Sequence, residues 1–322
     1  MERAHRKEAG ARGPKIKVCK PNALASTGDT KITGAANLGK RGREETAKPL
    51  ITVVTPCLNA IGTINANMAS VLAAQRSLKE SGWELEHLIV EGGSKDGTAE
   101  FVEEQVSRHS YCRSLSGISG GAYAAMNTGV QHARGEYIHI INADDLILDP
   151  ESYAKVLMDG YQQASVVLIS SIAYFCRPEK HIKSIWIAAP VAPDRQTWRR
   201  RLLRGLHYPH PGFVAKSEIY KHVSFDQGYS LSADYKLMQT ILLNLNSADH
   251  VFICRQPLIA MAEGGATGSW KARLEGWKQL RAINKELGIR SSSLKRYCSK
   301  WWQRMRPLQQ QFLVDRVINH MP

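Results

Sequence analysis

Apolar positions follow two different periods along the first half of the chain. A short β-branched run predicts a strand over 51–55, and short segments with apolar residues predict further strands over 85–90, 111–115 and 137–141, of which 111–115 has the weakest pattern. Between these runs, apolar residues spaced three and four apart predict helices over 64–78, 98–106 and 122–132. Strands that alternate with helices form βαβ units. The pattern therefore predicts an α/β fold with a mostly parallel sheet flanked by helices.

The second half of the chain has a less regular pattern. Strands are expected over 165–175, 182–188, 214–223 and 251–261, the third of them passing into a helix. Helices are expected over 198–206, 232–243 and 270–287. The last helix has an apolar stripe, which we interpret as core packing, formed by Trp270, Leu274, Trp277, Leu280 and Leu287.

Charge and composition divide the chain into three parts. The net charge of +14 splits into +7 over residues 1–50, −2 over 51–269 and +9 over 270–322. Residues 1–49 show neither period and are predicted to be a disordered basic extension. Residues 50–269 are predicted to form the folded domain, and 270–322 a helical basic and aromatic region. A protein that binds nucleic acid through its main domain should be basic there, so that class is the weakest candidate.

Cysteine usage and hydropathy indicate where the protein works. The six cysteines lie far apart without a CxxC pair, which is typical of a reduced, cytoplasmic protein and argues against a zinc site. The longest nearly apolar run, 165–175, is shorter than the ~20 residues that span a bilayer.

Aromatic and basic residues interleave near the C-terminus. At helical spacing stand Leu294, Tyr297, Trp301, Trp302, Met305 and Leu308. Between them stand Lys295, Arg296, Lys300, Arg304 and Arg306. This composition favours a helix on an anionic membrane surface, and the alternative is a helix docked on the folded domain.

Two polar clusters directly follow predicted strands. Residues 91–98 follow the strand 85–90, and Asn142-Ala143-Asp144-Asp145 follows 137–141. Ligands bind beyond the carboxyl ends of parallel strands, so we expect both clusters to share one crevice. The adjacent carboxylates suit Mg²⁺ or Mn²⁺, which in turn would hold a diphosphate. The alternative is helix capping by Asp144, Asp145 or Asp149.

Two further motifs leave alternatives open. The paired glycines Gly92 and Gly93 allow a close approach to a ligand and Asp96 can cap the next helix, but a plain βα turn would look the same. The predicted helix over 198–206 and its flank are rich in arginine. Either they clamp a diphosphate or lipid-diphosphate acceptor, or they form a solvated basic face: Arg195, Arg199, Arg200, Arg201 and Arg204.

Taken in order, these motifs resemble those of one enzyme family. They comprise residues 55–59, 91–98, 121–130, 133–138 and 142–145, followed by 209–213, 232–235 and the glycine turn 264–268. The series is similar to that of the nucleotide-sugar-dependent inverting glycosyltransferases of family two, especially bacterial members that build surface polysaccharides. The resemblance covers roughly residues 50–268. It implies a GT-A fold with a nucleotide-binding sheet, a more irregular acceptor half and a C-terminal helical tail.

The resemblance also implies roles for individual residues. It implies a nucleoside pocket lined by Thr55, Pro56, Asn59, Glu91 and Ser94, with Asn142 and Asp144 at the donor diphosphate. It implies a divalent metal, Mn²⁺ or Mg²⁺, at Asp144, Asp145 and His210. Asp234 is implied as the general base, and Asp226 is its rival.

Some positions depart from the family pattern. Glu91 and Asn142 replace aspartates, and the aspartates expected near 119 and 124 are Ser119 and Ala124. Those two lost carboxylates make the sugar specificity harder to predict.

The expected function is transfer of a sugar from a nucleoside diphosphate donor to a glycan or lipid-linked acceptor. The expected location is the cytoplasm, at the inner face of the cytoplasmic membrane. One alternative is a sugar-phosphate nucleotidyltransferase, although the glycine-rich loop of those enzymes does not follow the strand 51–55. The other is a non-catalytic sugar-nucleotide-binding protein, which the losses at Ser119 and Ala124 favour and the retained Asp144 and Asp234 oppose.

Overall fold

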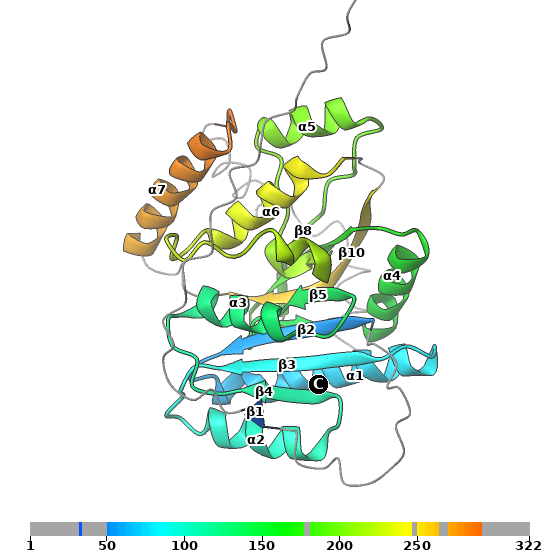
Figure 1. The fold of residues 1–322 in the computed structure, drawn as a ribbon, viewed down its shortest axis with the longest axis vertical. Coiled ribbons are helices and arrows are strands. Elements are labelled where there is room, and N and C mark those ends of the chain that lie inside the picture. Colours follow the sequence, from blue (N-terminus) through cyan, green and yellow to red (C-terminus); the bar gives the residue numbers. More distant parts are fainter. Residues whose placement is uncertain (1–31, 34–49, 177–180, 247–249, 264–269, 292–322) are drawn as a thin grey trace, which may run out of the picture.

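The first half of the chain alternates strands and helices, as predicted (Figure 1). The computed structural model describes residues 32–33, 50–176, 181–246, 250–263 and 270–291. The first-half elements are β2 (Ile51–Cys57), α1 (Ile61–Glu80), β3 (Leu85–Glu91), α2 (Thr98–Arg108), β4 (Cys112–Leu115), α3 (Ala122–His132) and β5 (Tyr137–Ile140). The bounds of α3 match the prediction, and those of the others lie within a few residues of it.

The second half contains shorter and more varied elements. They are β6 (Leu146–Ile147), α4 (Pro150–Gln162), β7 (Val167–Cys176), β8 (His181–Trp186), α5 (Arg195–Leu203), the 3₁₀ turns η1 (His210–Gly212) and η2 (Ser217–Lys221), β9 (Phe213–Lys216), α6 (Ala233–Asn244), β10 (Val251–Ala262) and α7 (Trp270–Glu286). Asp149 caps α4 by accepting the backbone N–H of Ser152 at 2.9 Å, which confirms that part of the capping alternative.

One ten-stranded sheet runs through the molecule in the order β1-β4-β3-β2-β5-β9-β7-β10-β6, with β8 paired to β7. Strands β4, β3, β2 and β5 are parallel neighbours, as are β7 and β10. Strand β9 is antiparallel to both β5 and β7 and joins the two parallel groups. The carboxyl ends of β2, β3 and β5 therefore lie at one edge of the sheet.

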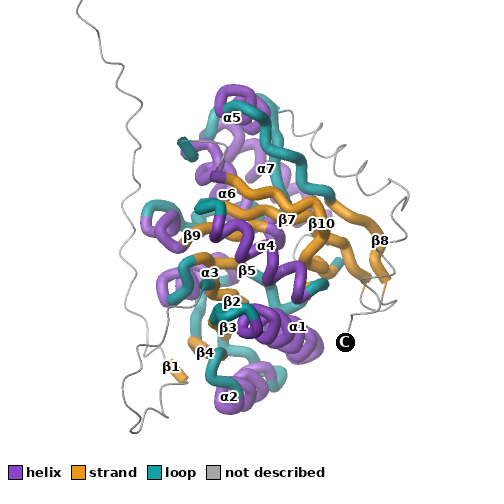
Figure 2. The backbone as a smooth tube through the Cα atoms, turned by 90° about the vertical axis from the view of Figure 1, so that its right-hand side faces the viewer, coloured by secondary structure: helices purple, strands orange, loops and turns teal. Residues whose placement is uncertain are grey.

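Helices cover both faces of the sheet (Figure 2). α1 and α4 pack on one face through a core that includes Val71 and Leu157. α3, α5 and α6 pack on the other face through a core that includes Met126, Trp198 and Leu237. Burial on both faces explains why β2, β3 and β5 carry apolar residues on both sides, rather than the alternating pattern of a strand with one face in water.

Strand β2 does not stop at Pro56, which corrects the expected end of the first strand. It continues to Cys57, and Pro56 pairs with Val90 of β3. On the other side of β2, pairing with β5 ends at Val54 and Ile140. Pro56 lies beyond the end of that ladder, so its missing N–H removes no strand hydrogen bond there.

The N-terminal extension contains one short ordered piece. Ile32 and Thr33 form β1, which pairs antiparallel with Leu115 and Ser114 of β4. The prediction of disorder is therefore wrong for these two residues, and the rest of 1–49 lies outside the described residues. The predicted C-terminal membrane helix and the glycine turn at 264–268 lie outside them as well. Among the described helices, none combines the length and apolarity that crossing a bilayer requires.

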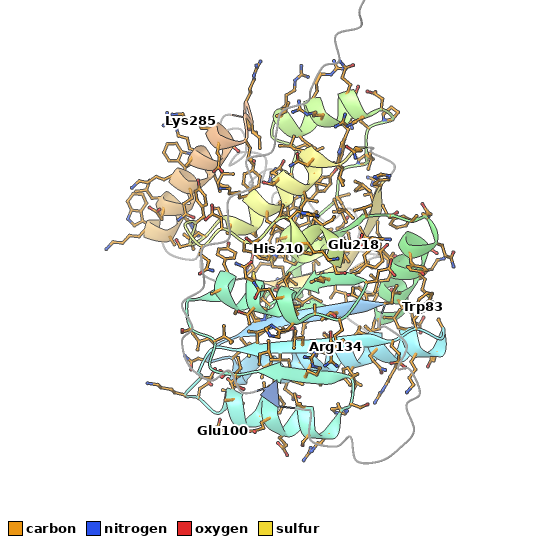
Figure 3. All side chains as sticks on the ribbon, in the orientation of Figure 1. Trp83, Glu100, Arg134, His210, Glu218 and Lys285 are labelled. Atoms are coloured by element: carbon orange, nitrogen blue, oxygen red, sulfur yellow. The ribbon has the colours of Figure 1, made fainter. Side chains whose placement is uncertain are left out.

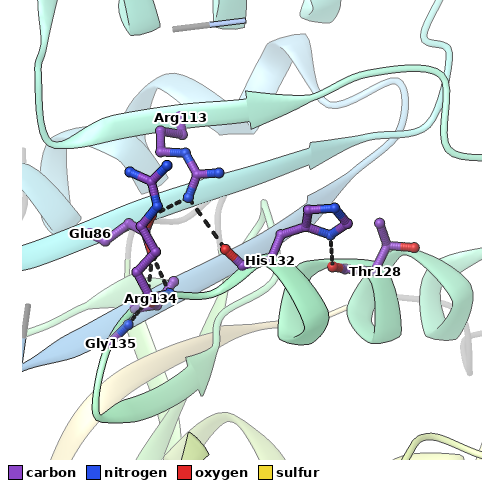
Figure 4. Close-up of polar contacts among 7 residues, drawn as sticks. Glu86, Arg113, Thr128, His132, Arg134 and Gly135 are labelled. Carbon is purple, nitrogen blue, oxygen red and sulfur yellow. Dashed lines mark hydrogen bonds and ion pairs between the residues drawn. The ribbon is translucent and has the colours of Figure 1, made fainter. Parts of the chain in front are cut away.

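A buried glutamate fixes the turn between α3 and β5 (Figure 4). Glu86 is 5% exposed and accepts hydrogen bonds from Thr52 Oγ1 at 2.6 Å and the Arg134 backbone N–H at 2.9 Å. Its other oxygen pairs with the Arg113 guanidinium. A Cβ on Gly135 would lie 2.3 Å from the Thr52 nitrogen, so the close approach of this turn to β2 requires glycine. The cluster anchors the turn that leads into β5.

Two buried histidines predict acid sensitivity. Burial lowers the pKa of His87 to about 3 and that of His139 to about 4, so both are neutral in the folded protein. The unfolded chain binds a proton at each histidine below pH ~6.5 while the folded chain does not, so stability falls as pH falls. Between pH 7 and 5, we expect urea denaturation to show a loss of about 4 kcal/mol in the free energy of unfolding.

The exposed His250 offers the control for this prediction. The variant His250→Ala should retain the full loss of stability between pH 7 and 5. A free energy of unfolding that stays constant over this range would contradict the assignment of His87 and His139 as neutral buried groups.

Candidate active site

Two loops at the carboxyl ends of β2 and β3 are joined by side-chain hydrogen bonds. Asn59 adopts a left-handed conformation (φ 50°), and its Oδ1 accepts the Lys95 backbone N–H at 3.0 Å. Its own backbone N–H donates to Ser94 Oγ at 2.8 Å. The Ala60 N–H donates to Thr98 Oγ1, also at 2.8 Å. Asn59 and Ser94, both predicted at the nucleoside pocket, therefore lie together at this edge.

The side chains of Thr55 and Glu91 turn inward at the same edge. Thr55 is fully buried, and its hydroxyl lies 3.0 Å from His87 Nε2. Glu91 is 2% exposed and accepts the backbone N–H groups of Gly93 at 2.9 Å and Ser94 at 2.6 Å. The Glu91 carboxylate thus shapes the turn. A nucleoside contact by either residue would involve backbone atoms, as it would for the buried Pro56.

Asp96 lies just before α2, whose N-cap residue is Gly97 with φ 91°. The Asp96 carboxylate accepts the Thr98 hydroxyl at 2.6 Å and the Ile61 backbone N–H at 3.1 Å. The hydrogen bond from Thr98 is the largest cause that lowers the pKa of Asp96. The turn 91–98 therefore reaches across to the first turn of α1.

The turn 142–145 reaches the same edge through α1. Asn67 on α1 donates from Nδ2 to the carbonyl oxygens of Asn142 at 3.0 Å and Asp145 at 2.8 Å. Ala143 packs with Cys57 of β2 and Ile89 of β3 in one buried cluster. The two polar clusters predicted from the sequence thus lie at one sheet edge.

The two aspartates of this turn have different environments. Asp145 is 1% exposed, and its carboxylate accepts the Ala262 backbone N–H at 3.0 Å and Asn142 Nδ2 at 3.2 Å. Asp144 is only half-buried. Asp145 therefore ties the turn to β10, whereas Asp144 is the more accessible carboxylate for a ligand.

The turn fits a divalent cation held jointly with a bound diphosphate. Within the described ranges, no three His, Cys, Asp or Glu side chains gather as a ready-made metal site. Mg²⁺ in phosphate-transfer sites is usually held by one or two carboxylates together with substrate oxygens and water. Asp144 supplies such a carboxylate. The contacts described for His210 are with Phe225 and the neighbourhood of Asp234, so its role as a third metal ligand stays a prediction.

A second group of polar and aromatic residues surrounds Asp234, in the first turn of α6. Tyr123 of α3 donates a hydrogen bond from its hydroxyl to Asp234 Oδ1 at 3.1 Å. Burial, followed by the charge of Asp234, raises the pKa of Tyr123, so the phenol stays protonated. Ser232 is the N-cap residue of α6, and its side chain forms no cap hydrogen bond.

His210 completes this group. Burial lowers its pKa, and the nearby charge of Asp234 partly opposes that shift. Its ring packs edge-on against Phe225, with centroids 5.9 Å apart. Figure 3 shows His210 near the middle of the molecule, below α6. His139 Nε2 lies 2.8 Å from the Pro211 carbonyl oxygen and must donate to it, which fixes the η1 turn that carries His210.

Asn127 and Phe225 support the group, and sequence reasoning assigned neither a role. Asn127 Nδ2 donates to the Phe225 carbonyl, and Asn127 Oδ1 accepts the Phe225 N–H, both at 2.8 Å. The Phe225 ring stacks on Tyr123 with centroids 5.7 Å apart. Tyr123 and Asn127 belong to the motif 121–130, and this motif was the sequence feature that could have pointed to their role. The partner Phe225 lies 98 residues from Asn127 along the chain.

Asp226 is engaged elsewhere. Lys236 donates to its carboxylate at 2.7 Å, and the Gly228 backbone N–H donates at 2.9 Å. These hydrogen bonds outweigh burial and lower the pKa of Asp226. A carboxylate held ionised in this way is a weaker base, which favours Asp234 over its rival.

The arginines of α5 lie on an exposed face. Only Trp198 and Leu202 of this helix are buried. Arg195 donates to the Leu245 carbonyl at 3.2 Å, and Arg200 donates to Thr197 at 3.3 Å. These contacts fit the solvated basic face, and the diphosphate clamp stays an untested prediction.

Comparison with known proteins gives a consistent result. The model of "Glycosyl transferase family 2" matches residues 52–225. Glycosyltransferase GlyG of Streptococcus pneumoniae is 31% identical over 122 residues, covering 37% of this chain and 38% of GlyG. Uncharacterized glycosyltransferase EpsJ of Bacillus subtilis is 29% identical over 99 residues, covering 31% of this chain and 27% of EpsJ. The matched part thus spans well under half the length of these curated relatives.

Solved structures show the same fold at low sequence identity. S. aureus TarS 1-349 superposes with a TM-score of 0.54 at 17% identity, covering 72% of this chain and 64% of that one. The complex of TarS 1-349 with UDP-GlcNAc gives the same TM-score and identity, with 72% and 65% covered. This likeness confirms the predicted α/β fold of the GT-A type.

Proposed function

The chain belongs to glycosyl transferase family 2, and we propose that it is an inverting glycosyltransferase. It moves a sugar from a nucleoside diphosphate donor to a hydroxyl of a glycan or lipid-linked acceptor. The observation that carries this proposal is Asp234, a half-buried carboxylate at the start of α6 that accepts a hydrogen bond from Tyr123 and lies beside His210.

The chemistry is a single displacement. The acceptor oxygen bonds to the anomeric carbon of the sugar while the bond to the leaving diphosphate breaks. Asp234 takes the proton of the acceptor hydroxyl. The Tyr123 hydrogen bond to Oδ1 orients the carboxylate so that its other oxygen can receive that proton.

The donor is proposed to bind where the turns 91–98 and 142–145 meet. Asn59 and Ser94 stiffen the nucleoside end of this edge, and Asp144 lies at the diphosphate end. A bound divalent metal, Mn²⁺ or Mg²⁺, would neutralise charge on the leaving diphosphate. The TarS complexes with UDP and with UDP-GlcNAc support a nucleotide-sugar donor.

The proposed product is a surface polysaccharide. Matched relatives include a poly-beta-1,6-N-acetyl-D-glucosamine synthase of Staphylococcus epidermidis and a putative teichuronic acid biosynthesis glycosyltransferase of Bacillus subtilis. Their names support this role. The location proposed with it is the inner face of the cytoplasmic membrane, where lipid-linked acceptors are built. The family match argues against a nucleotidyltransferase.

Thermal shift with a panel of UDP-, GDP- and dTDP-sugars, each with and without Mn²⁺, tests donor binding. A donor at about 100 times its Kd stabilises the folded state by about 2.7 kcal/mol. For a domain of this size, we expect one nucleotide class to raise Tm by about 5–10 °C in the presence of Mn²⁺. A panel without any selective shift would contradict the proposal.

A non-catalytic sugar-nucleotide binder is the second candidate, because Ser119 and Ala124 stand where the family has aspartates. Selective donor binding without transfer or donor hydrolysis would favour this candidate.

A further inference from the structure

Helix α7 exposes the residues that the sequence pattern assigned to the core. Trp270 is 72% exposed, Leu274 40% and Trp277 37%, and their spacing places them on one face of the helix. Of the predicted stripe, Leu280 and Leu287 pack against the domain. The core-packing interpretation is therefore wrong for the first half of α7, which presents two tryptophans and a leucine to the surroundings.

Basic residues flank this face. Lys271, Lys278 and Lys285 recur every seven residues and so lie along one side of the helix, and all three are exposed. Arg281 stacks on the exposed Trp277 at 5.8 Å from the ring centroid. An open groove beside Trp277 has Lys278, Arg281 and Lys285 in its wall. Figure 3 shows Lys285 at the outer edge of the molecule.

We propose that this face of α7 docks on an anionic phospholipid bilayer. Tryptophan beside an apolar residue, bordered by lysine and arginine, is typical of helices that lie in the headgroup region. Each basic residue near an anionic surface strengthens binding about fivefold. The inference deepens the proposed function and rests on it for the lipid-linked acceptor.

Charge favours an anionic bilayer over the segment 292–322 or a second copy of this chain as the occupant of this face. α7 carries five basic and two acidic residues. The following segment 292–322 of the same chain carries six basic residues and one acidic residue, so the two segments repel each other. A second copy would bring two cationic helices together in the same way. An anionic surface attracts α7 and the segment 292–322 alike.

The position of α7 connects docking to the proposed catalytic group. Tyr235, the neighbour of Asp234, donates its hydroxyl to Asn284 of α7 at 2.7 Å. Lys236 pairs with Glu286 of α7 at 2.6 Å. Gln279 Oε1 accepts the N–H of Leu231 in the loop that leads to α6 at 3.0 Å. A bilayer bound at α7 would therefore lie next to a helix in direct contact with α6, which carries Asp234.

Vesicle co-sedimentation of the full chain tests the proposal, with vesicles of phosphatidylcholine alone and vesicles that also contain phosphatidylglycerol. We expect selective binding to the anionic vesicles that weakens at high salt. The variants Trp270→Gln with Trp277→Gln, and Lys271→Glu with Lys278→Glu, should each weaken it at least about tenfold. The matched control is Arg76→Glu with Lys79→Glu, the same charge reversal on exposed positions of α1, which should bind as the parent does.

The remaining outcomes overturn the proposal. Equal pelleting of the parent and both α7 variants would assign lipid binding to another segment, such as 292–322. No selectivity for anionic vesicles would exclude a bilayer at this face. A dimer that only the α7 variants dissociate, without loss of vesicle binding, would assign the face to a second copy. Donor-induced thermal shift, measured on the same variants, should be retained, so failure of lipid docking is distinguishable from failure of the proposed function.

Discussion

Replacing Asp144 with alanine is expected to abolish the metal-dependent part of donor binding while the fold stays intact. Asp144 is the accessible carboxylate of the turn 142–145, whereas the position of that turn is fixed by Asn67 and Asp145. Without Asp144, a cation retains only donor oxygens and water as ligands. In thermal shift with donor, Mn²⁺ should raise Tm of the parent by several degrees and leave the variant unchanged. The donor affinity measured with Mn²⁺ should fall at least about tenfold, or about 1.4 kcal/mol.

Asp145 supplies the contrast within the same turn. Asp145→Ala leaves the buried N–H of Ala262 without its acceptor, which should cost about 1–3 kcal/mol of stability. We therefore expect Tm to fall more for Asp145→Ala, which removes a buried carboxylate, than for Asp144→Ala, which changes a half-buried one. If Asp145→Ala removed the Mn²⁺ dependence and Asp144→Ala preserved it, the metal assignment would pass to Asp145.

The parallel half of the sheet was predictable because its sequence carries local signals of two kinds. Strands such as β3, buried on both faces, carry adjacent apolar residues, and α1 and α3 carry a helical period. The short strands β1 and β6 carry no such signal, since each has two residues and forms only through its partner. Pairing of this kind depends on contacts distant in sequence, which a local pattern does not contain.

The amphipathic pattern of α7 shows a different limit. A stripe at helical spacing indicates that one face is apolar, but it does not say what covers that face. In α7 the domain covers Ile283 and leaves Trp270 exposed. The interleaved lysines and arginines were the available signal that this stripe differs from a core stripe.

The candidate site was predictable in its motifs and less so in its contacts. The clusters after the strands 85–90 and 137–141 indicated the turn 91–98 and Asp144, and the family resemblance implied Asp234. The hydrogen bond between Tyr123 and Asp234 joins residues 111 positions apart, so no local pattern could reveal it. Likewise, the sequence could not show that Glu91 turns inward onto Gly93 and Ser94.

Asp234→Asn is expected to reduce sugar transfer at least about a hundredfold. The amide keeps the shape of the carboxylate, and its oxygen can still accept the Tyr123 hydrogen bond, so Tm should stay close to that of the parent. Donor binding should also persist, because the hydrogen bond described for Asp234 leads to Tyr123 of α3 rather than to the turns 91–98 and 142–145. The amide cannot take a proton from the acceptor hydroxyl at neutral pH, and loss of a general base typically costs about 10²–10⁴-fold in turnover.

Asp226→Asn is the matched control, because it makes the same chemical change eight positions earlier, on the loop that leads to α6. In the parent, the Asp226 carboxylate accepts hydrogen bonds from Lys236 and from the Gly228 N–H. When Asp226→Asn removes the negative charge at 226, Lys236 still pairs with Glu286. Transfer by Asp226→Asn should therefore stay within a few-fold of the parent. Tyr123→Phe separates positioning from proton transfer: it removes the hydrogen bond that orients Asp234 but keeps the base, so its loss of turnover should be smaller than that of Asp234→Asn. An active Asp234→Asn enzyme beside an inactive Asp226→Asn enzyme would reverse the assignment, since the ion-paired carboxylate would then be the one that accepts the proton.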